Sequence, residues 1–405
     1  MIHLPRRDFL KTTGLLTGGL LLGTQLTEAF ATSVAGDKLR IGIIGCGDRG
    51  TGLLKILQEL PDKYEVTALC DELPFRLRDA QKIGAASKAK TYADYRALLE
   101  ARNVDAVIIS VPLNLHFAVA KAALLAGKQV YLEKTMTHNI EQATELVTLA
   151  QQRPRQILQV GHQYRYSPLY YRVKEMIDQG YLGKVTQIDC RWDRNGSWRR
   201  PVPEPSLERK INWRMYREYS GGLAAELLSH QLDFIHWAFN TTPDEIFGTG
   251  GIDYYKDGRE TYDNVQVMVR YAREGMVGNF GATCGNARDG YLFKLKGTKG
   301  TISLLIDQGI YYPEKETLKQ YGTVDGVTGA TKITWDKNGG IPITTEPLKD
   351  GSWYALNDFY KAVQDKKLPD SNVYTGARVA CAVYLANQAI YNHTIEKWRP
   401  EFNFS

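Results

Sequence analysis

Short apolar runs alternate with longer amphipathic segments from residue 38 to about residue 158. The runs are nearly continuous, which is typical of parallel strands that are buried on both faces. They predict strands over 39–44, 64–70, 104–111, 129–132 and 156–160. Helix-like patterns between them cover 51–60, 73–83, 93–101, 117–126 and 140–152. This alternation predicts a doubly wound parallel sheet, in which ligands bind beyond the carboxyl ends of the strands.

The second part of the chain shows a period of two in its apolar and polar positions. After a predicted helix over 169–179, this pattern predicts strands over 184–195, 246–255, 264–273, 276–284, 291–296 and 301–306. Short turns join the later strands, which implies a mostly antiparallel sheet. A loop or lid rich in Pro, Arg and Trp is predicted over 196–209, and helices are predicted over 353–364 and 376–391.

The first predicted strand runs directly into Gly45, Gly47 and Gly50, which have G-x-G-x-x-G spacing. Gly45 permits a tight turn, Gly47 lets a pyrophosphate approach the backbone, and Gly50 lets the following helix pack closely on the strand. The amides at the helix start, at Asp48 and Arg49, then face the phosphates with the help of the helix dipole. This combination of strand, glycines and helix predicts a dinucleotide site.

Asp71 follows the second predicted strand and lies 21 residues beyond Gly50. A carboxylate at this place accepts hydrogen bonds from the adenosine ribose and repels a 2′-phosphate, which favours NAD over NADP. Arg76 and Arg78 lie close enough in sequence to weaken that preference.

The predicted fold class is therefore α/β plus α+β. An N-terminal Rossmann sheet is followed by a mostly antiparallel sheet with helices on one face. The predicted domains are 38–158 for the nucleotide, 159–351 for substrate and oligomer contacts, and 352–400 for helices that pack back near the first domain.

Further candidate site residues follow the ends of the later strands, namely Pro112, Asn114, His116, Glu133 and Lys134. Together with the glycine loop, the segments VPLNLH (111–116) and Glu133-Lys134 resemble the Gfo/Idh/MocA family of glucose–fructose oxidoreductases and inositol dehydrogenases. The family's usual Glu-Lys-Pro has Thr135 in place of proline here. The resemblance covers nearly all of 38–400, and it implies that Gln163 and Arg165 lie near the nicotinamide. His116 and His162 are expected to line the cofactor pocket or to pack beside it.

The segment 221–233 matches the family pattern of a glycine pair, an acid, a histidine four residues on and an aspartate three residues later. On a helix, Glu226, His230 and Asp233 share one face. The family's acid is usually aspartate, whereas this chain has Glu226. The resemblance implies that Lys134, Glu226 and His230 are the catalytic set. Lys134 would polarise the alcohol oxygen or act as the base, His230 is the other proton acceptor, and Glu226 would bind a neighbouring hydroxyl or orient the pair.

Composition narrows the classes of partner. The formal net charge is only +6 and no run of five basic residues occurs, so nucleic-acid binding is not expected. The five cysteines are widely spaced and form no C-x-x-C or Cys/His cluster, which argues against a metal site and against a disulfide framework.

Residues 1–31 have the features of a leader. Arg6 and Arg7 precede an apolar run over 14–26, and residues 29–31 supply an A-x-A cleavage site. The run is shorter than the ~20 residues of a membrane span, so no stable membrane anchor is expected. The arrangement resembles a twin-arginine export signal, which predicts a periplasmic or exported protein. An ordinary secretory signal and an amphipathic N-terminal helix are the alternatives.

Free NAD is not expected outside the cytoplasm, so an exported member of this family would retain its NAD. One expectation is an oxidoreductase that acts on a secondary hydroxyl of a sugar, polyol or glycoside. The alternative is a redox-neutral glycoside hydrolase that works by transient oxidation, elimination, water addition and re-reduction. A third reading is a sugar-binding protein with structural NAD. The resemblance also implies a homo-oligomer, a dimer or a tetramer.

Overall fold

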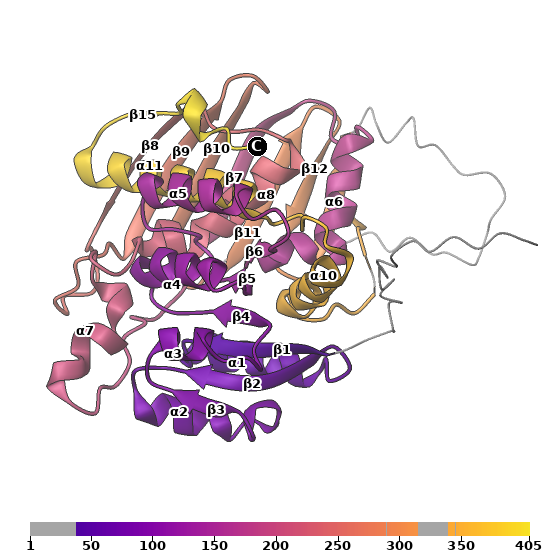
Figure 1. Ribbon diagram of the computed structural model, residues 1–405. Helices are drawn as coiled ribbons and strands as arrows, with labels where there is room; N and C mark the ends of the chain where they lie inside the picture. The colour runs from indigo at the N-terminus through magenta and orange to yellow at the C-terminus, as the bar shows by residue number, and fades with distance from the viewer. Residues whose placement is uncertain (1–37, 289, 315–338, 345) are drawn as a thin grey trace, which may run out of the picture. The chain divides into compact units, whose positions relative to one another are not determined.

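The first sheet of the protein has six parallel strands in the order β3-β2-β1-β4-β5-β6 (Figure 1). The computed structural model describes residues 38–288, 290–314, 339–344 and 346–405, so the predicted leader lies outside the described residues. The strands are β1 (Leu39–Ile44), β2 (Tyr64–Cys70), β3 (Lys90–Tyr92), β4 (Ala106–Ile109), β5 (Gln129–Leu132) and β6 (Leu158–Val160). Their order changes direction between β1 and β4, and this confirms the predicted doubly wound sheet.

The helices of this part follow their strands along the chain. They are α1 (Asp48–Gln58), α2 (Pro74–Gln81), α3 (Tyr95–Leu99), α4 (Leu113–Leu125) and α5 (Ile140–Gln151). The helix predicted over 117–126 begins earlier than expected, because α4 starts at Leu113 with Pro112 at its N-cap. Proline fits this place, since a helix start needs no amide hydrogen there.

The second sheet has nine strands in the order β14-β13-β12-β11-β7-β10-β9-β8-β15. They are β7 (Val185–Trp192), β8 (Glu245–Gly251), β9 (Asn264–Tyr271), β10 (Met276–Thr283), β11 (Tyr291–Gly297), β12 (Gly300–Leu304), β13 (Gly309–Pro313), β14 (Ile341–Pro342) and β15 (Glu396–Lys397). The β7–β10 pair is parallel, and the other pairs of described strands are antiparallel. The predicted mostly antiparallel sheet is therefore confirmed.

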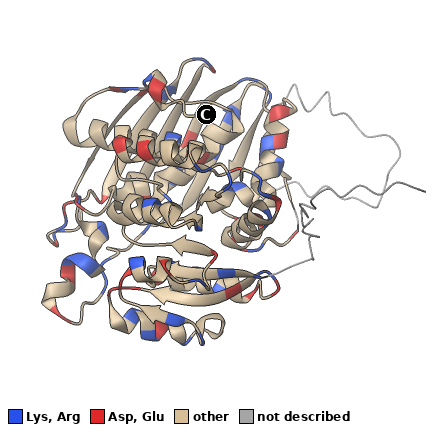
Figure 2. Cartoon of the chain, in the orientation of Figure 1, with Lys and Arg blue, Asp and Glu red and all other residues tan. Residues whose placement is uncertain are grey.

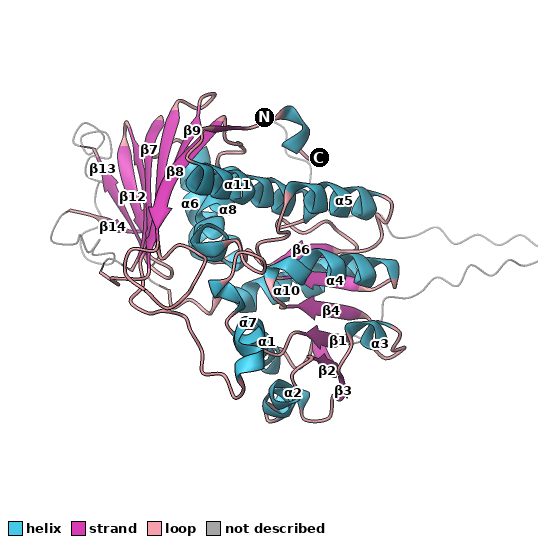
Figure 3. Cartoon of the chain, turned by 90° about the vertical axis from the view of Figure 1, so that its left-hand side faces the viewer, coloured by secondary structure: helices cyan, strands magenta, loops and turns pink. Residues whose placement is uncertain are grey.

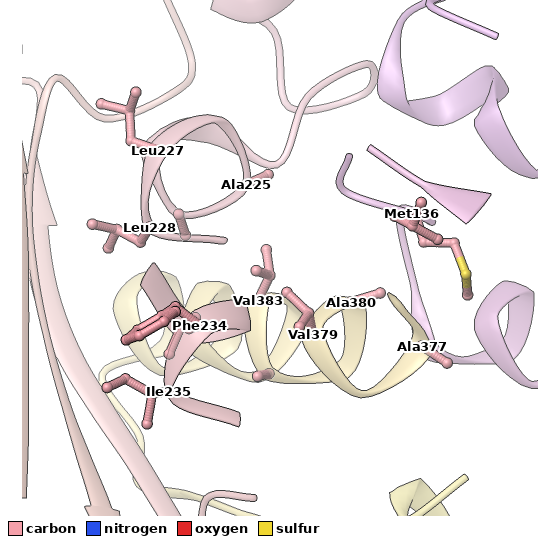
Figure 4. Packing of buried hydrophobic residues seen from close by; sticks show 14 of the residues in the cluster. Met136, Ala225, Leu227, Leu228, Phe234, Ile235, Ala377, Val379, Ala380 and Val383 are labelled. Atoms are coloured by element: carbon pink, nitrogen blue, oxygen red, sulfur yellow. The ribbon is translucent and has the colours of Figure 1, made fainter. Parts of the chain in front are cut away.

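Helices lie on one face of the second sheet, between it and the first sheet (Figure 3). The helices of this part are α6 (Pro168–Asp178), α7 (Glu208–Ile211), α8 (Ser229–Ala238), α10 (Gly351–Asp365) and α11 (Val373–Asn392). Buried side chains of α8, of the turn before it and of α11 belong to one apolar cluster, among them Leu228, Phe234 and Val383 (Figure 4). No helix in the described part of the chain combines the length and apolar character that a membrane span requires.

The turn before α8 differs from the regular helix on which Glu226, His230 and Asp233 were expected to share one face. Residues Ala224–Leu228 form a π-helical turn, and the α-helix proper begins at Ser229. A π-helical turn interrupts the regular ladder of backbone hydrogen bonds and is often found at functional sites. Carbonyl groups of this turn are therefore available to side chains from elsewhere.

Helix α10 completes the core of the first sheet although it lies some 190 residues after β6. Leu356 and Phe359 are fully buried in one apolar cluster with Ile41 and Tyr131. Side chains of the first sheet also bind the backbone of α10, since Gln159 Nε2 donates a hydrogen bond of 2.8 Å to the carbonyl of Ala355. The C-terminal segment is thus part of the structure that positions the strand ends.

Candidate active site

A cavity of about 660 Å³ extends from the glycine loop to the π-helical turn before α8. Small-molecule sites usually have volumes of roughly 300–1,000 Å³. The predicted site residues that line it are Gly45, Gly47, Asp48, Arg49, Asp71, Pro112, His116, Glu133, Lys134, Gln163, Glu226 and His230. Gly50, Asn114 and Arg165 are not among the lining residues. Residues predicted from both halves of the chain therefore meet at one cavity.

The glycine loop is shaped by two steric constraints. Gly45 has φ +94°, and a Cβ there would lie 2.5 Å from the carbonyl oxygen of Ser110. A Cβ on Gly50 would lie 2.0 Å from the carbonyl oxygen of Gly45. By contrast, a Cβ on Gly47 would meet nothing closer than the guanidinium of Arg76, at 3.6 Å. Gly47 therefore borders open cavity at the start of α1, where a pyrophosphate is predicted to lie.

Asp71 connects the end of β2 to the glycine loop. Its carboxylate accepts hydrogen bonds from the amides of Cys46 at 2.8 Å and Leu73 at 2.9 Å. Arg76 Nη1 lies 3.9 Å away. Burial raises the pKa of Asp71, and the two amides and Arg76 oppose that effect. Asp71 lines the cavity where the adenosine ribose is predicted to lie.

Arg49 and Glu133 border the cavity but also bind each other. Arg49 Nε donates to Glu133 Oε1 at 2.7 Å, and Arg49 Nη1 donates to Ser352 Oγ at 3.1 Å. These contacts join the start of α1 to the end of β5 and to α10. Arg49 and Glu133 therefore hold these three elements together, in addition to the contact with the cofactor that was predicted for them.

His116 and Asn114 lie in the first turns of α4. The ring of His116 is buried between two carbonyl oxygens, with Nδ1 2.8 Å from Thr135 O and Nε2 3.0 Å from Val111 O. Burial lowers the pKa of His116, although both carbonyls oppose this. The Oδ1 atom of Asn114 is buried without a hydrogen-bond partner in the described structure. His116 thus joins the loop after β4 to the loop that carries Lys134.

Lys134 is held at the cavity wall by the π-helical turn. Its Nζ donates a hydrogen bond of 2.9 Å to the carbonyl of Glu226, and Thr135 Oγ1 donates to the carbonyl of Ala225 at 3.1 Å. The peptide bond between Lys134 and Thr135 is cis. Burial lowers the pKa of Lys134, while Glu226 and Glu133 act to raise it. The lysine therefore contacts the backbone of Glu226, and not its carboxylate.

The carboxylate of Glu226 is bound by an arginine that sequence reasoning missed. Arg214 Nε donates to Glu226 Oε2 at 2.9 Å, and the Arg214 guanidinium lies 4.3 Å from the ring centre of Trp213. Burial acts to raise the pKa of Glu226, but Arg214 and then Lys134 hold it below its usual value. Arg214 lies 12 residues before Glu226 on another element, so no periodicity connected the two.

His230 lies in an aromatic wall of the cavity. Its ring centre is 4.8 Å from that of Tyr164 and 5.5 Å from that of Trp192. Burial lowers the pKa of His230 well below its usual range, and Lys134 and His162 add to this. A neutral imidazole at this place can accept a proton. The aromatic rings that line the same cavity offer flat apolar faces on which a sugar ring can stack.

Arg165 and Asp233 lie behind the cavity wall as a buried ion pair. Arg165 Nε donates to Asp233 Oδ2 at 2.9 Å, and Nη2 donates to Oδ1 at 2.5 Å. Both side chains are at most 2% exposed. His162 lies beside this pair and is also buried. Among the described residues, no group of three or more His, Cys, Asp and Glu side chains is arranged to hold a metal ion.

Comparison with known proteins covers both halves of the chain. Residues 39–162 match the family model "Oxidoreductase family, NAD-binding Rossmann fold", and residues 170–303 match the "GFO/IDH/MocA C-terminal domain" model. The inositol 2-dehydrogenase/D-chiro-inositol 3-dehydrogenase of Lactiplantibacillus plantarum is 29% identical over 202 residues, which are 50% of this chain and 52% of that protein. A glycosyl hydrolase family 109 protein of Shewanella amazonensis is 29% identical over 262 residues, 56% of each chain. The chain thus spans about half the length of these curated relatives.

Solved structures with the same fold extend over most of the chain. An oxidoreductase domain protein from Kribbella flavida superposes with a TM-score of 0.74 at 19% identity, over 89% of this chain and 99% of that one. Levoglucosan dehydrogenase in complex with NADH gives a TM-score of 0.71 at 19% identity, again over 89% and 99%. At this level of identity the likeness is one of fold.

Proposed function

Because the chain belongs to the Gfo/Idh/MocA oxidoreductase family, we propose that it uses NAD to oxidise a secondary hydroxyl of a sugar, polyol or glycoside. The observation that carries the proposal is the meeting of Lys134, Glu226 and His230 at one wall of the cavity. The glycine loop and Asp71 border the same cavity. A dinucleotide held there would place its reactive end near these three side chains.

The residues present fit a bound dinucleotide. Gly47 and the helix start at Asp48 would hold the pyrophosphate, and Asp71 would hold the adenosine ribose. When bound, NAD supplies a nicotinamide ring that accepts a hydride. Lys134 donates a hydrogen bond to the alcohol oxygen, and the neutral ring of His230 accepts the hydroxyl proton. Glu226, kept ionised by Arg214, accepts a hydrogen bond from a neighbouring hydroxyl.

A panel of potential substrates tests this function. Purified protein is incubated without added NAD with myo-inositol, levoglucosan and p-nitrophenyl glycosides, and absorbance at 340 nm and at 400 nm is followed. Oxidation of a polyol or sugar, with NADH formed on the protein, supports the proposal. Release of p-nitrophenol without net NADH contradicts it and supports the redox-neutral glycosidase, which the match to a family 109 glycosyl hydrolase favours.

We also propose that the protein is exported, because residues 1–31 resemble a twin-arginine signal, and that it therefore keeps its NAD bound. Ion pairs across the cavity support the retention of NAD. Residues 196–211, here called the strap, come from the second half of the chain and form ion pairs with the first half. Arg200 Nη2 lies 2.7 Å from Asp48 Oδ2 at the start of α1, and Lys210 Nζ lies 2.8 Å from Glu72 Oε2 beyond β2. Arg200 and Lys210 both line the cavity. Basic and acidic residues on α7, which belongs to the strap, are visible in Figure 2.

Removing the strap's two ion pairs is expected to speed the loss of NAD. Exposed ion pairs contribute about 0–1 kcal/mol each, so the Arg200→Ala/Lys210→Ala variant should release NAD roughly 2- to 10-fold faster. The release rate is measured by dilution of the NAD-loaded protein into an NAD trap. The matched control is Arg209→Ala, because Arg209 pairs with Glu218 and Glu260 within the second half. Equal release rates in both variants would contradict a role of the strap in retention.

A further inference from the structure

We propose that Arg194 binds an anionic group of the substrate, so that the cavity takes an acidic sugar in preference to a neutral one. An acidic sugar here means a sugar with a carboxylate, or with a sulfate or phosphate ester. The inference deepens the proposed function, because it rests on this cavity as the substrate site and names the class of substrate. Arg194 lines the cavity, although it was not among the predicted site residues.

The backbone holds Arg194 beside the aromatic wall of the cavity. Arg194 follows β7, and its amide donates a hydrogen bond of 2.8 Å to the carbonyl of Thr283 at the end of β10. Its guanidinium lies 5.5 Å from the ring centre of Trp192. The ring of Trp192 therefore neighbours both this guanidinium and the ring of His230, the proposed proton acceptor. A sugar that lies against Trp192 is within reach of both groups.

The other cations that line the cavity already have partners. Arg214 is bound to Glu226, and Nζ of Lys134 donates to a backbone carbonyl. The ion pairs nearer the glycine loop are Arg49–Glu133, Arg76–Asp71, Arg200–Asp48 and Lys210–Glu72. The exposed guanidinium of Arg194, by contrast, forms no ion pair or hydrogen bond within the described part of the chain. Its charge is therefore left for a ligand.

A guanidinium is suited to an anionic group on a sugar. Its planar fork donates two parallel hydrogen bonds to the oxygens of a carboxylate, and it binds phosphate in the same way. The charge of Arg194 also reaches the aromatic wall. Burial raises the pKa of Tyr164 to about 12 and Asp350 adds to the rise, whereas Arg49 and Arg194 act to lower it. Since the ring of Tyr164 lies beside that of His230, the anion is held near the proposed catalytic set.

The predicted pyrophosphate site has a different arginine beside it. A Cβ on Gly47 would lie 3.6 Å from the guanidinium of Arg76, which is also paired with Asp71. Arg194 instead neighbours the aromatic rings around His230. This position favours an anion on the substrate over a phosphate of NAD.

Calorimetric titration of the NAD-loaded, full-length protein tests the proposal. Methyl β-D-glucuronide is compared with methyl β-D-glucoside, which has a hydroxymethyl group in place of the carboxylate. Glucose 6-phosphate and glucose 6-sulfate are each compared with glucose. At least one acidic sugar is expected to bind about 10-fold more tightly than its neutral partner, and added salt should reduce the difference. The acidic sugar that binds most tightly identifies the anionic group. Equal binding within every pair, or no binding of any acidic sugar, overturns the proposal.

This measurement separates the inference from the proposed function, because binding needs no turnover. If acidic sugars bind preferentially but none is oxidised, the inference stands and the proposed function fails. If a neutral sugar is oxidised and no acidic sugar binds more tightly than its neutral partner, the proposed function stands and the inference fails.

A variant then assigns the preference to Arg194. Arg194→Gln removes the charge and keeps a polar side chain. It is expected to weaken binding of the most tightly bound acidic sugar about 10-fold, to leave binding of the neutral partner within about 2-fold, and to keep NAD bound. Arg191→Gln is the matched control, because Arg191 donates to Gln266 at 2.8 Å and does not line the cavity. Loss of NAD from the Arg194→Gln protein, or equal weakening of both sugars, overturns the inference.

Discussion

Lys134→Ala is expected to lower turnover by about 10²- to 10⁴-fold while NAD remains bound. The side chain lies at the cavity wall, where its ammonium is held by the carbonyl of Glu226. Alanine removes the group that polarises the alcohol oxygen, whereas the glycine loop and Asp71 stay in place. Turnover is followed with the substrate that the panel identifies, and bound NAD is measured by its release on denaturation.

Lys128→Ala is the matched control for this variant. Lys128 also donates to two backbone carbonyls, those of Ala101 at 3.0 Å and Val104 at 2.7 Å, but it does not line the cavity. Its replacement removes a comparable set of contacts and should leave turnover within about 2-fold. Loss of NAD from the Lys134→Ala protein would instead give Lys134 a role in holding the cofactor.

Arg165→Met is expected to lower the free energy of unfolding by about 3–5 kcal/mol. The substitution leaves the carboxylate of Asp233 buried without its cation, and an uncompensated buried charge is strongly destabilising. The unfolding midpoint in urea measures the effect. Arg172→Met is the control, because Arg172 pairs with Glu175 at the surface, where such a pair contributes only about 0.2–0.5 kcal/mol.

The double variant Arg165→Met/Asp233→Leu extends this prediction. Replacing both partners of a buried ion pair by apolar residues is often neutral, so most of the lost stability should return. A single Arg165→Met variant as stable as the surface control would show that the buried pair adds nothing to the fold.

The strands of the first sheet could be predicted because each is a local apolar run. The glycine loop could be predicted because the steric constraints on its glycines are also local. The clash that excludes a side chain at Gly50 involves Gly45, five residues away. The family resemblance then connected Lys134 with His230, which no local pattern does. All three predicted catalytic residues line the cavity, and their roles stay predictions until they are tested.

Other features depend on contacts between distant segments and left no local pattern. The π-helical turn replaces the expected regular helix. Lys134 therefore donates to the backbone carbonyl of Glu226, whereas the simpler expectation is a contact with the Glu226 carboxylate. Arg165 was predicted to lie near the nicotinamide, yet its charge is paired with Asp233, 68 residues later. The parallel β7–β10 pair is likewise invisible in the period-two pattern, because a register of strands is set by the assembled sheet.

The packing of α10 also bears on how the protein is made. Domains of a nascent chain generally fold as units, the N-terminal one first. Here the first sheet buries its core against Leu356 and Phe359, and the amide of Val160 in its last strand donates to the carbonyl of Ser371. These partners are synthesised in the last part of the chain. The nucleotide-binding half therefore cannot complete its core until α10 has been synthesised. A chain that terminates before residue 351 lacks this helix and leaves that core incomplete.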